Sequence, residues 1–302
     1  MLWLRFAFAG VCTLLGAAAV AQDFAAAKIT AQQLAPGLLL LFGGGGGVVA
    51  GNTLVSIGDQ GVLIVDTQFP PMVPKYRVMI AALGGAGRDI DFAINTHWHD
   101  DHAEGNKVLG PDGVALIAHE NSRAMLTKNN SINVVRTVLD QPAYPAAALP
   151  VITFDDRLRL HFNGEDIDLV HVGPAHTAGD TAVILRGHNA LHMGDVFITS
   201  GYPFVDVDDG GDLDGMIEFC RAVLEEIDRN TIIVPGHGEV ASYQDLADYV
   251  AMLTTVRGRI AALIADGASL EQVAAAKPTA EWDAQRGNPA YFINRSYASL
   301  TH

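Results

Sequence analysis

One short segment, residues 96–102 with the sequence THWHDDH, constrains the chain more than any other feature. It concentrates four potential metal-binding side chains, which are His97, His99, Asp101 and His102. Residues 92–95, of which the first three are apolar, come directly before it and predict a buried strand. In an extended segment, side chains two positions apart share a face, so His97 and His99 point the same way, while Asp101 and His102 can turn toward an adjacent position. The segment therefore predicts loop-borne ligands for two neighbouring metal ions.

Three further candidate ligands follow later, each at the end of an apolar strand pattern. They are His176, Asp195 and His237, and small residues beside them permit close approach of the backbone. Each alone is weak evidence, because a histidine after a strand is commonly a surface residue and a Gly-Asp pair is commonly a turn. The alternative for residues 96–102 is a solvated loop; the apolar flanks and the three later candidates argue against it.

In this order, the residues resemble the metallo-β-lactamase superfamily, whose pattern is H-x-H-x-D-H, a single His, a single Asp and a final His in Gly-His-Gly. The resemblance covers residues 51–238 and implies an α/β protein, a four-layer αββα sandwich. It implies one metal held by His97, His99 and His176, another held by Asp101, His102 and His237, and a bridging carboxylate from Asp195. Asp66 resembles the family's buried acid that steadies the metal loop; alternatively, it ends a strand and caps a turn.

The resemblance implies a metal-dependent hydrolase. Imidazole and carboxylate ligands suit zinc, so two Zn²⁺ are expected, with iron or manganese left open. Two such ions roughly 3.5–4 Å apart would share a hydroxide and lower the pKa of bound water toward about 7, which provides a nucleophile at neutral pH. Asp101 would orient that hydroxide and is the expected catalytic residue. No serine or cysteine nucleophile is needed.

The substrate is less well defined than the chemistry. Zinc β-lactamases of the best-known subclass have a cysteine at the position of Asp195 and a lysine after it, but here residues 196–208 contain no Lys or Arg. The aspartate instead resembles that of hydroxyacylglutathione hydrolases, lactonases and related esterases. We expect opening of a β-lactam, lactone or related cyclic amide or ester. The alternatives are a thioester hydrolase of the hydroxyacylglutathione hydrolase type and an iron-dependent persulfide dioxygenase. Tyr202 is a candidate donor to a developing oxyanion.

Residues 1–21 predict a secretory signal peptide, because Arg5 precedes an apolar run that ends in small residues at Ala21. We therefore expect a periplasmic or secreted protein with no stable membrane insertion after cleavage. Cleavage removes Cys12 and leaves only Cys220, so no intramolecular disulfide is expected. Cys220 lies in a helical pattern and is interpreted as a core residue.

The formal net charge of -15 argues against nucleic acid or an anionic membrane as a partner, because both require clustered Lys and Arg. A small-molecule substrate is expected, and the sequence leaves the oligomeric state open.

Short apolar strand patterns alternate with helical patterns along the chain, which is typical of an α/β domain. We expect one αββα domain over residues 22–240 and a C-terminal helical extension over residues 241–302 that packs on it. The glycine-rich residues 43–47 predict a flexible loop. Helices are predicted over residues 73–83, 213–227, 242–265 and 270–275, and strands over residues 38–42, 52–57, 61–66, 92–95, 157–162, 166–172, 181–185, 190–193 and 231–234.

Overall fold

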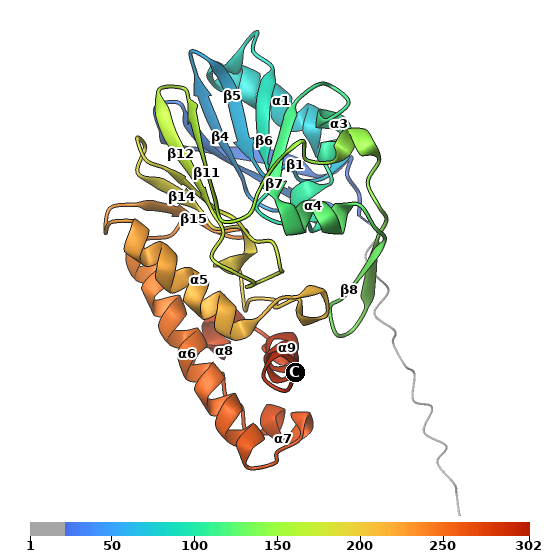
Figure 1. Ribbon diagram of the computed structural model, residues 1–302, viewed down its shortest axis with the longest axis vertical. Coiled ribbons are helices and arrows are strands. Elements are labelled where there is room, and N and C mark those ends of the chain that lie inside the picture. Colours follow the sequence, from blue (N-terminus) through green and yellow to red (C-terminus); the bar gives the residue numbers. More distant parts are fainter. Residues whose placement is uncertain (1–21) are drawn as a thin grey trace, which may run out of the picture.

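The computed structural model describes residues 22–302, so the predicted signal peptide lies outside the described residues. Two β-sheets lie face to face (Figure 1). The strands of the first sheet are β1 (Lys28–Ala35), β2 (Leu38–Gly45), β3 (Val48–Val49), β4 (Thr53–Gly58), β5 (Gly61–Val65), β6 (Ile90–Ile94), β7 (Ala115–His119) and β10 (Ile152–Phe154). Those of the second are β11 (Arg157–Phe162), β12 (Glu165–Val170), β13 (Ala182–Leu185), β14 (Ala190–His192) and β15 (Ile232–Val234). A separate hairpin consists of β8 (Asn130–Asn133) and β9 (Val138–Gln141).

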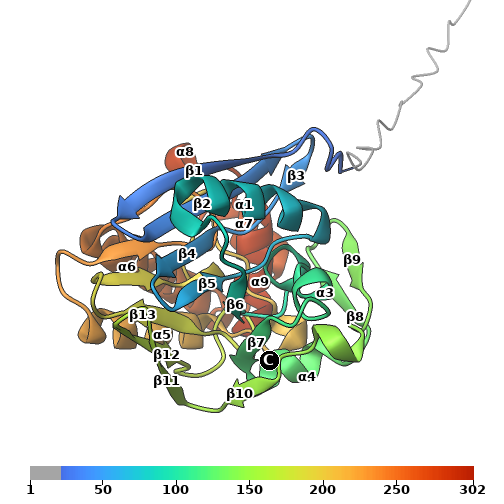
Figure 2. The ribbon, with the colours of Figure 1, turned by 90° about the horizontal axis from the view of Figure 1, so that it is seen from above.

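Helices cover the outer face of each sheet, which makes four layers in the order helix, sheet, sheet, helix (Figures 1 and 2). The helices are α1 (Val73–Ile80), α2 (Asp100–Ala103), α3 (Asn106–Leu109), α4 (Glu120–Leu126), α5 (Leu213–Glu226), α6 (Tyr243–Ala265), α7 (Leu270–Ala275), α8 (Asp283–Arg286) and α9 (Ala290–Ser299). The predicted αββα sandwich is confirmed.

Alternation along the strands separates the hydrophobic core into layers, because successive side chains point to opposite faces of a sheet. In β2, Leu40 faces the second sheet and belongs to one cluster with Leu169 of β12. Leu39 and Leu41 face the other way and share a cluster with Tyr76 of α1. A third cluster lies between the second sheet and α5, α6 and α9. Both sheets are therefore packed on both faces, which sets the positions of their strand ends.

Of the C-terminal helices, α6 packs beside α5 on the outer side of the second sheet, and α7 and α9 pack against α6 and each other (Figure 1). Helix α6 begins with a capping box, in which Ser242 and Asp245 each bind the other's backbone N–H. Tyr249 and Leu253 of α6 share a buried cluster with Phe219 of α5. The division of the chain at residues 240 and 241 stays a prediction. Within residues 22–302, no helix combines the length and the hydropathy needed to cross a membrane.

The structure differs from the sequence predictions at a few elements. The expected flexible loop over residues 43–47 is wrong in its first part, because Gly43–Gly45 continue β2 and pair with β1 and β3. The predicted helix over residues 73–83 is regular only to Ile80, and a wider turn follows it. The sequence predictions also missed several elements, which are strands β1, β3, β7 and β10, the β8–β9 hairpin and helices α2, α3, α4, α8 and α9. In β1 and the hairpin, most residues are exposed and show no clear apolar period.

Candidate metal centre

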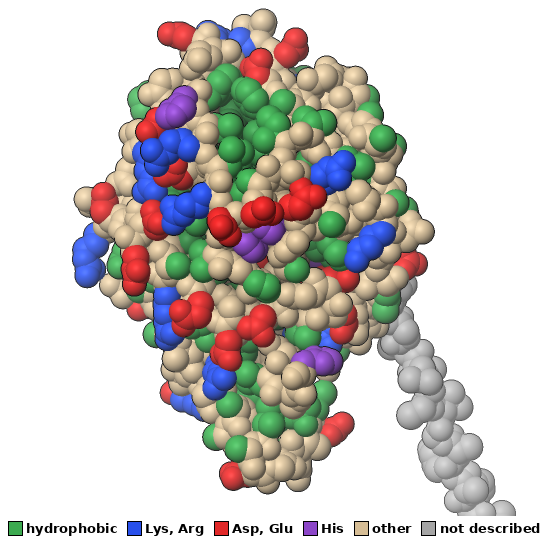
Figure 3. Space-filling view, in the orientation of Figure 1, with side chains coloured by type: hydrophobic (Ala, Val, Ile, Leu, Met, Phe, Trp, Pro, Cys, Tyr) green, Lys and Arg blue, Asp and Glu red, His purple; other side chains and the backbone are tan. Residues whose placement is uncertain are grey.

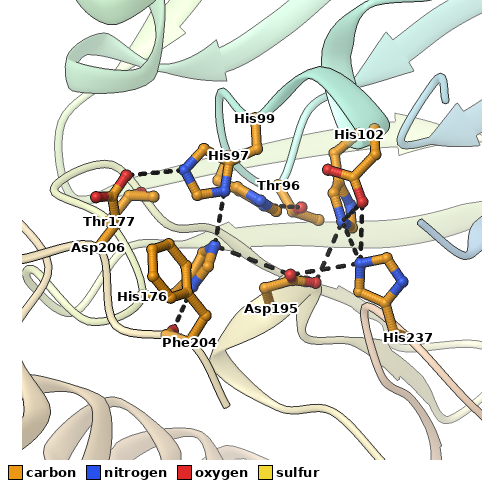
Figure 4. Close-up of polar contacts among 12 residues, drawn as sticks. Thr96, His97, His99, His102, His176, Thr177, Asp195, Phe204, Asp206 and His237 are labelled. Atoms are coloured by element: carbon orange, nitrogen blue, oxygen red, sulfur yellow. Dashed lines mark hydrogen bonds and ion pairs between the residues drawn. The ribbon is translucent and has the colours of Figure 1, made fainter. Parts of the chain in front are cut away.

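All seven predicted ligands lie together where strands of both sheets end (Figure 4). Four of them follow β6 of the first sheet, and one each follows β12, β14 and β15 of the second. Their donor atoms form three overlapping groups, each within 4.8 Å: His97, His99 and His176; His97, His102 and Asp195; and Asp101, His102 and His237. Their role as ligands stays a prediction, and their convergence supports it.

Asp195 lies between the two halves of the cluster (Figure 4). On one side, His99 Nδ1 is 3.0 Å from His176 Nε2, and on the other, His102 Nε2 is 3.2 Å from His237 Nε2. Asp195 Oδ1 is 3.2 Å from His102 Nε2, and its Oδ2 is 3.4 Å from His237 Nε2 and 3.9 Å from His176 Nε2. One carboxylate thus reaches both halves, as a bridging ligand must.

Four of the histidines have one ring nitrogen against an oxygen and the other turned toward the cluster centre. The outer contacts are His97 Nδ1 with Thr96 Oγ1 (3.0 Å), His99 Nε2 with Asp206 Oδ2 (2.9 Å), His102 Nδ1 with Asp66 Oδ2 (2.7 Å) and His176 Nδ1 with the Phe204 carbonyl (2.7 Å). Carboxylates and carbonyls only accept, and the Thr96 hydroxyl accepts from His97 because its own proton goes to Asp66. These outer nitrogens therefore carry the proton. In a neutral ring, the inner nitrogen is then a free lone pair.

The inner nitrogens fit a bound cation. Two lone pairs only 3.0 Å apart, on His99 and His176, would repel each other, so a proton or a metal ion has to lie near them. Burial opposes protonation of His99, but Asp206 raises its pKa, so a proton on His99 can serve when no metal is bound. His97 Nε2 is buried and has no hydrogen-bond partner within residues 22–302. Burial lowers the pKa of His97 well below its usual value and lowers the pKa of His176 to about 4, so both rings stay neutral and able to ligate. The nitrogen and oxygen donors suit zinc, iron or manganese.

The carboxylates make the cluster attractive to positive charge. Burial alone would raise the pKa of Asp195, but His237 and His102 hold it well below its usual range. Burial likewise opposes protonation of His237, yet Asp195 and Asp101 raise its pKa to about 10. The same negative charges that hold a proton on His237 would hold a metal ion in its place.

Asp66 braces the loop that carries the first four candidate ligands. Its carboxylate is fully buried, accepts hydrogen bonds from the backbone N–H (2.7 Å) and hydroxyl (2.8 Å) of Thr96, and contacts His102. Its backbone has a positive φ of 65°, which costs energy for a residue other than glycine and persists where surrounding contacts impose it. Of the two interpretations of Asp66, these contacts favour the one in which it steadies the metal loop.

Two glycines, Gly51 and Gly236, leave space for the side chains of candidate ligands. A Cβ on Gly51 would collide with the His102 ring, and one on Gly236 would collide with Asp195 Oδ1. Neither has a positive φ, so what requires glycine here is space rather than backbone conformation.

Tyr202 does not fit the suggested role of oxyanion donor. Its hydroxyl donates to Asp283 Oδ1 at 2.8 Å and contacts the Thr279 carbonyl at 3.2 Å. The hydroxyl therefore points to the C-terminal segment, and its proton is not directed to the candidate ligands. Cys220 lies in the buried cluster around α5, as interpreted from the sequence.

Sequence reasoning missed Asp206, which is fully buried and orients His99. It lies in the acidic stretch 206–209, and nothing in that stretch distinguishes it from its neighbours. The contact joins residues 107 positions apart, so no local pattern could have indicated it.

A cavity of about 710 Å³ opens over the cluster. His99, His176, Asp195 and His237 form part of its wall, with Asp101 at the same end. A small molecule in this cavity would therefore contact the candidate ligands directly.

A four-layer αββα fold with histidines and aspartates gathered at its strand ends defines a metal-dependent hydrolase. The family model for the metallo-beta-lactamase superfamily matches residues 46–251, and the chain belongs to this family. The predicted family is thereby confirmed. Enzymes of this superfamily use two metal ions.

Two relatives show how far the similarity extends. The chain is 27% identical over 148 residues to the 2,4-dinitroanisole O-demethylase subunit alpha of Nocardioides sp. (strain JS1661), covering 49% of this chain but only 41% of that protein. It is 24% identical over 197 residues to a protein of Methanocaldococcus jannaschii named as a probable metallo-hydrolase, covering 63% and 89% of the two chains.

Solved structures share the fold. The DIM-1 metallo-beta-lactamase has a TM-score of 0.60 at 20% identity, with 76% of this chain and 98% of that chain covered. The metallo-beta-lactamase from Pontibacter korlensis has a TM-score of 0.61 at 16% identity, with 75% and 99% covered. At such low identity, the likeness establishes the fold alone.

Proposed function

We propose that this protein is an exported, dinuclear zinc-dependent hydrolase that opens a carbonyl substrate, namely a β-lactam, a lactone or a related cyclic amide or ester. The observation that carries the proposal is the pair of facing nitrogens on either side of Asp195, 3.0 Å apart for His99 and His176 and 3.2 Å apart for His102 and His237. The name of the Methanocaldococcus jannaschii relative supports hydrolysis. Export rests on the sequence of residues 1–21.

When bound, two divalent cations would supply an acidified water and an electrophile for the carbonyl oxygen. In hydrolysis, the water oxygen bonds to the carbonyl carbon, the bond to the ring nitrogen or oxygen breaks, and that leaving atom receives a proton. Asp101 faces the cavity with Oδ2 at 3.0 Å from His237 Nε2, where it would orient the water and accept its proton. Asp66 and Asp206 act one step away, by fixing the rings of His102 and His99.

Metal analysis combined with substrate assays tests the proposal. Purified protein should contain two zinc ions per chain and hydrolyse a chromogenic cephalosporin or a lactone, with loss of activity in chelator and recovery on adding zinc. Turnover of a thioester alone would point to the thioester hydrolase. Asp101→Asn should lower kcat by about 10²–10⁴-fold even at saturating zinc, and it should also weaken binding of one of the two ions, because Asp101 is a predicted ligand as well. Turnover that is insensitive to chelator would contradict the mechanism. One iron per chain with oxygen consumption on a persulfide would point to the dioxygenase instead.

A further inference from the structure

One wall of the cavity over the metal centre is apolar and comes from the β8–β9 hairpin. Ile132 and Leu139 are cross-strand partners, and both line the cavity together with Val134 and Val138. Val138 is 56% exposed and Leu139 is 45% exposed, although both are large apolar side chains. Exposed apolar side chains at the mouth of a cavity are typical of a surface that binds an apolar ligand group.

The hairpin is fastened to the loop that carries the candidate ligands. Gln141, the last residue of β9, donates from Nε2 to the Trp98 carbonyl at 2.8 Å, and Trp98 lies between two candidate ligands in the sequence. Ile132 packs in one buried cluster with Trp98 and Leu126. The apolar wall therefore keeps a set position relative to the metal centre, and a substrate held against it would be presented to the reacting water in one orientation.

The charge of the cavity is entirely acidic apart from its histidines. Its lining includes no Lys or Arg within residues 22–302, but it includes Asp100 and Asp140 in addition to Asp101 and Asp195. Neither Asp100 nor Asp140 forms an ion pair with a described Lys or Arg. Asp140 lies on the hairpin and accepts a hydrogen bond from the Ser131 hydroxyl at 2.9 Å. A substrate carboxylate beside Asp140 would meet negative charge and no Lys or Arg to balance it, and positive charge would come only from metal ions held by the candidate ligands.

We propose that the substrate is an uncharged ester or lactone with an apolar chain or ring, which Val138 and Leu139 of the hairpin bind, and that substrates carrying a carboxylate are disfavoured at the Asp140 rim. This inference rests on the proposed hydrolase function and selects among its candidate substrates. It favours lactones and esters over β-lactams that bear a carboxylate next to the ring.

A substrate series measures both parts of the inference on the zinc-loaded protein. We use aryl esters and lactones with acyl chains of increasing length, and a matched set in which the chain ends in a carboxylate. Each added methylene should raise kcat/KM by about fourfold until the chain extends past the hairpin. The terminal carboxylate should lower kcat/KM by about tenfold or more relative to the neutral compound of equal length.

Variants assign the effect to the hairpin. Leu139→Ala should lower kcat/KM for the longest neutral ester by about tenfold relative to the shortest. Val151→Ala is the matched control, because Val151 is also exposed, at 75%, but lies outside the cavity lining, and it should leave the chain-length dependence unchanged.

The charge at the rim has its own pair of variants. Asp140→Lys should raise the ratio of carboxylate to neutral turnover by about fivefold at low salt, and the gain should fade as salt is added. Asp266→Lys makes the same change of net charge at the end of α6, away from the cavity, and should leave the ratio as it is.

Binding supplies a readout that does not depend on turnover. A dialkyl ether analogue of the longest ester has neither a carbonyl carbon for water to attack nor an aryl leaving group, and its binding should show a negative heat-capacity change that shrinks in Leu139→Ala. If esters are hydrolysed but neither chain length nor the carboxylate matters, the inference is wrong and the hydrolase stands. If no carbonyl compound is turned over, the proposed function is wrong, and the ether analogue alone decides whether the hairpin binds apolar groups.

Discussion

Two buried carboxylates, on Asp66 and Asp206, determine how the histidines of the metal centre are oriented. Each contacts the outer nitrogen of one ring, and each comes from a segment distant in sequence from the histidine it holds. A histidine fixed in this way presents its inner nitrogen with one proton arrangement and one direction. We therefore expect metal affinity to depend on Asp66 and Asp206, which are not candidate ligands themselves.

Replacement of Asp206 tests this dependence. Asp206→Asn should weaken zinc binding by about 10–100-fold, because an amide holds the His99 ring less firmly than a carboxylate does. Competition with a chromogenic chelator measures the affinity. Asp209→Asn, in the same acidic stretch but with no side-chain contact to a candidate ligand, should bind zinc like the unaltered protein. Equal affinities for both variants would show that Asp206 has no such role.

At the scale of elements, strand ends and the turns after them bring the ligands together. The candidate ligands lie in the short segments that directly follow β6, β12, β14 and β15. Small residues in these segments let the backbone pass close to the cluster. Gly236 directly precedes His237 and leaves no space for a side chain beside Asp195. Gly258, in the middle of α6, has nothing within 4 Å of the position of an added Cβ.

These two glycines should respond in opposite ways to the same substitution. Gly258→Ala should raise the free energy of unfolding by about 0.5–1 kcal/mol, because alanine favours a helix interior. Gly236→Ala should lower zinc content and activity, since the methyl group displaces Asp195. Urea unfolding and metal analysis on both variants provide the comparison, and full zinc occupancy in Gly236→Ala would argue against a tight site.

For the whole molecule, the candidate metal centre lies where strand ends of the two sheets meet. The first sheet contributes His97, His99, Asp101 and His102, and the second contributes His176, Asp195 and His237. The donor set is assembled only when both sheets are packed, so the folded state should bind metal far more tightly than the unfolded chain.

Removal of metal should consequently destabilise the entire domain. Free zinc at about 100 times its Kd would stabilise the folded state by about 2.7 kcal/mol, which corresponds to a Tm higher by roughly 5–10 °C for a domain of this size. Calorimetry with zinc and with chelator measures the difference. A Tm that is the same in both would mean that the cluster does not hold a metal in the folded protein.

The candidate ligands and most strands of this protein are encoded in short stretches of sequence, whereas several contacts around the site arise only in the folded structure. Local patterns were enough to identify the seven candidate ligands and most strands, because apolar periodicity and donor chemistry are properties of neighbouring residues. They could not identify the contact of Asp206 with His99, the hydrogen bond from Gln141 to the Trp98 carbonyl, or the apolar wall formed by the β8–β9 hairpin. Those features arise only where segments distant in sequence pack together in the tertiary structure. Many polar and apolar residues along the chain could make such contacts, and local sequence patterns do not indicate which of them do.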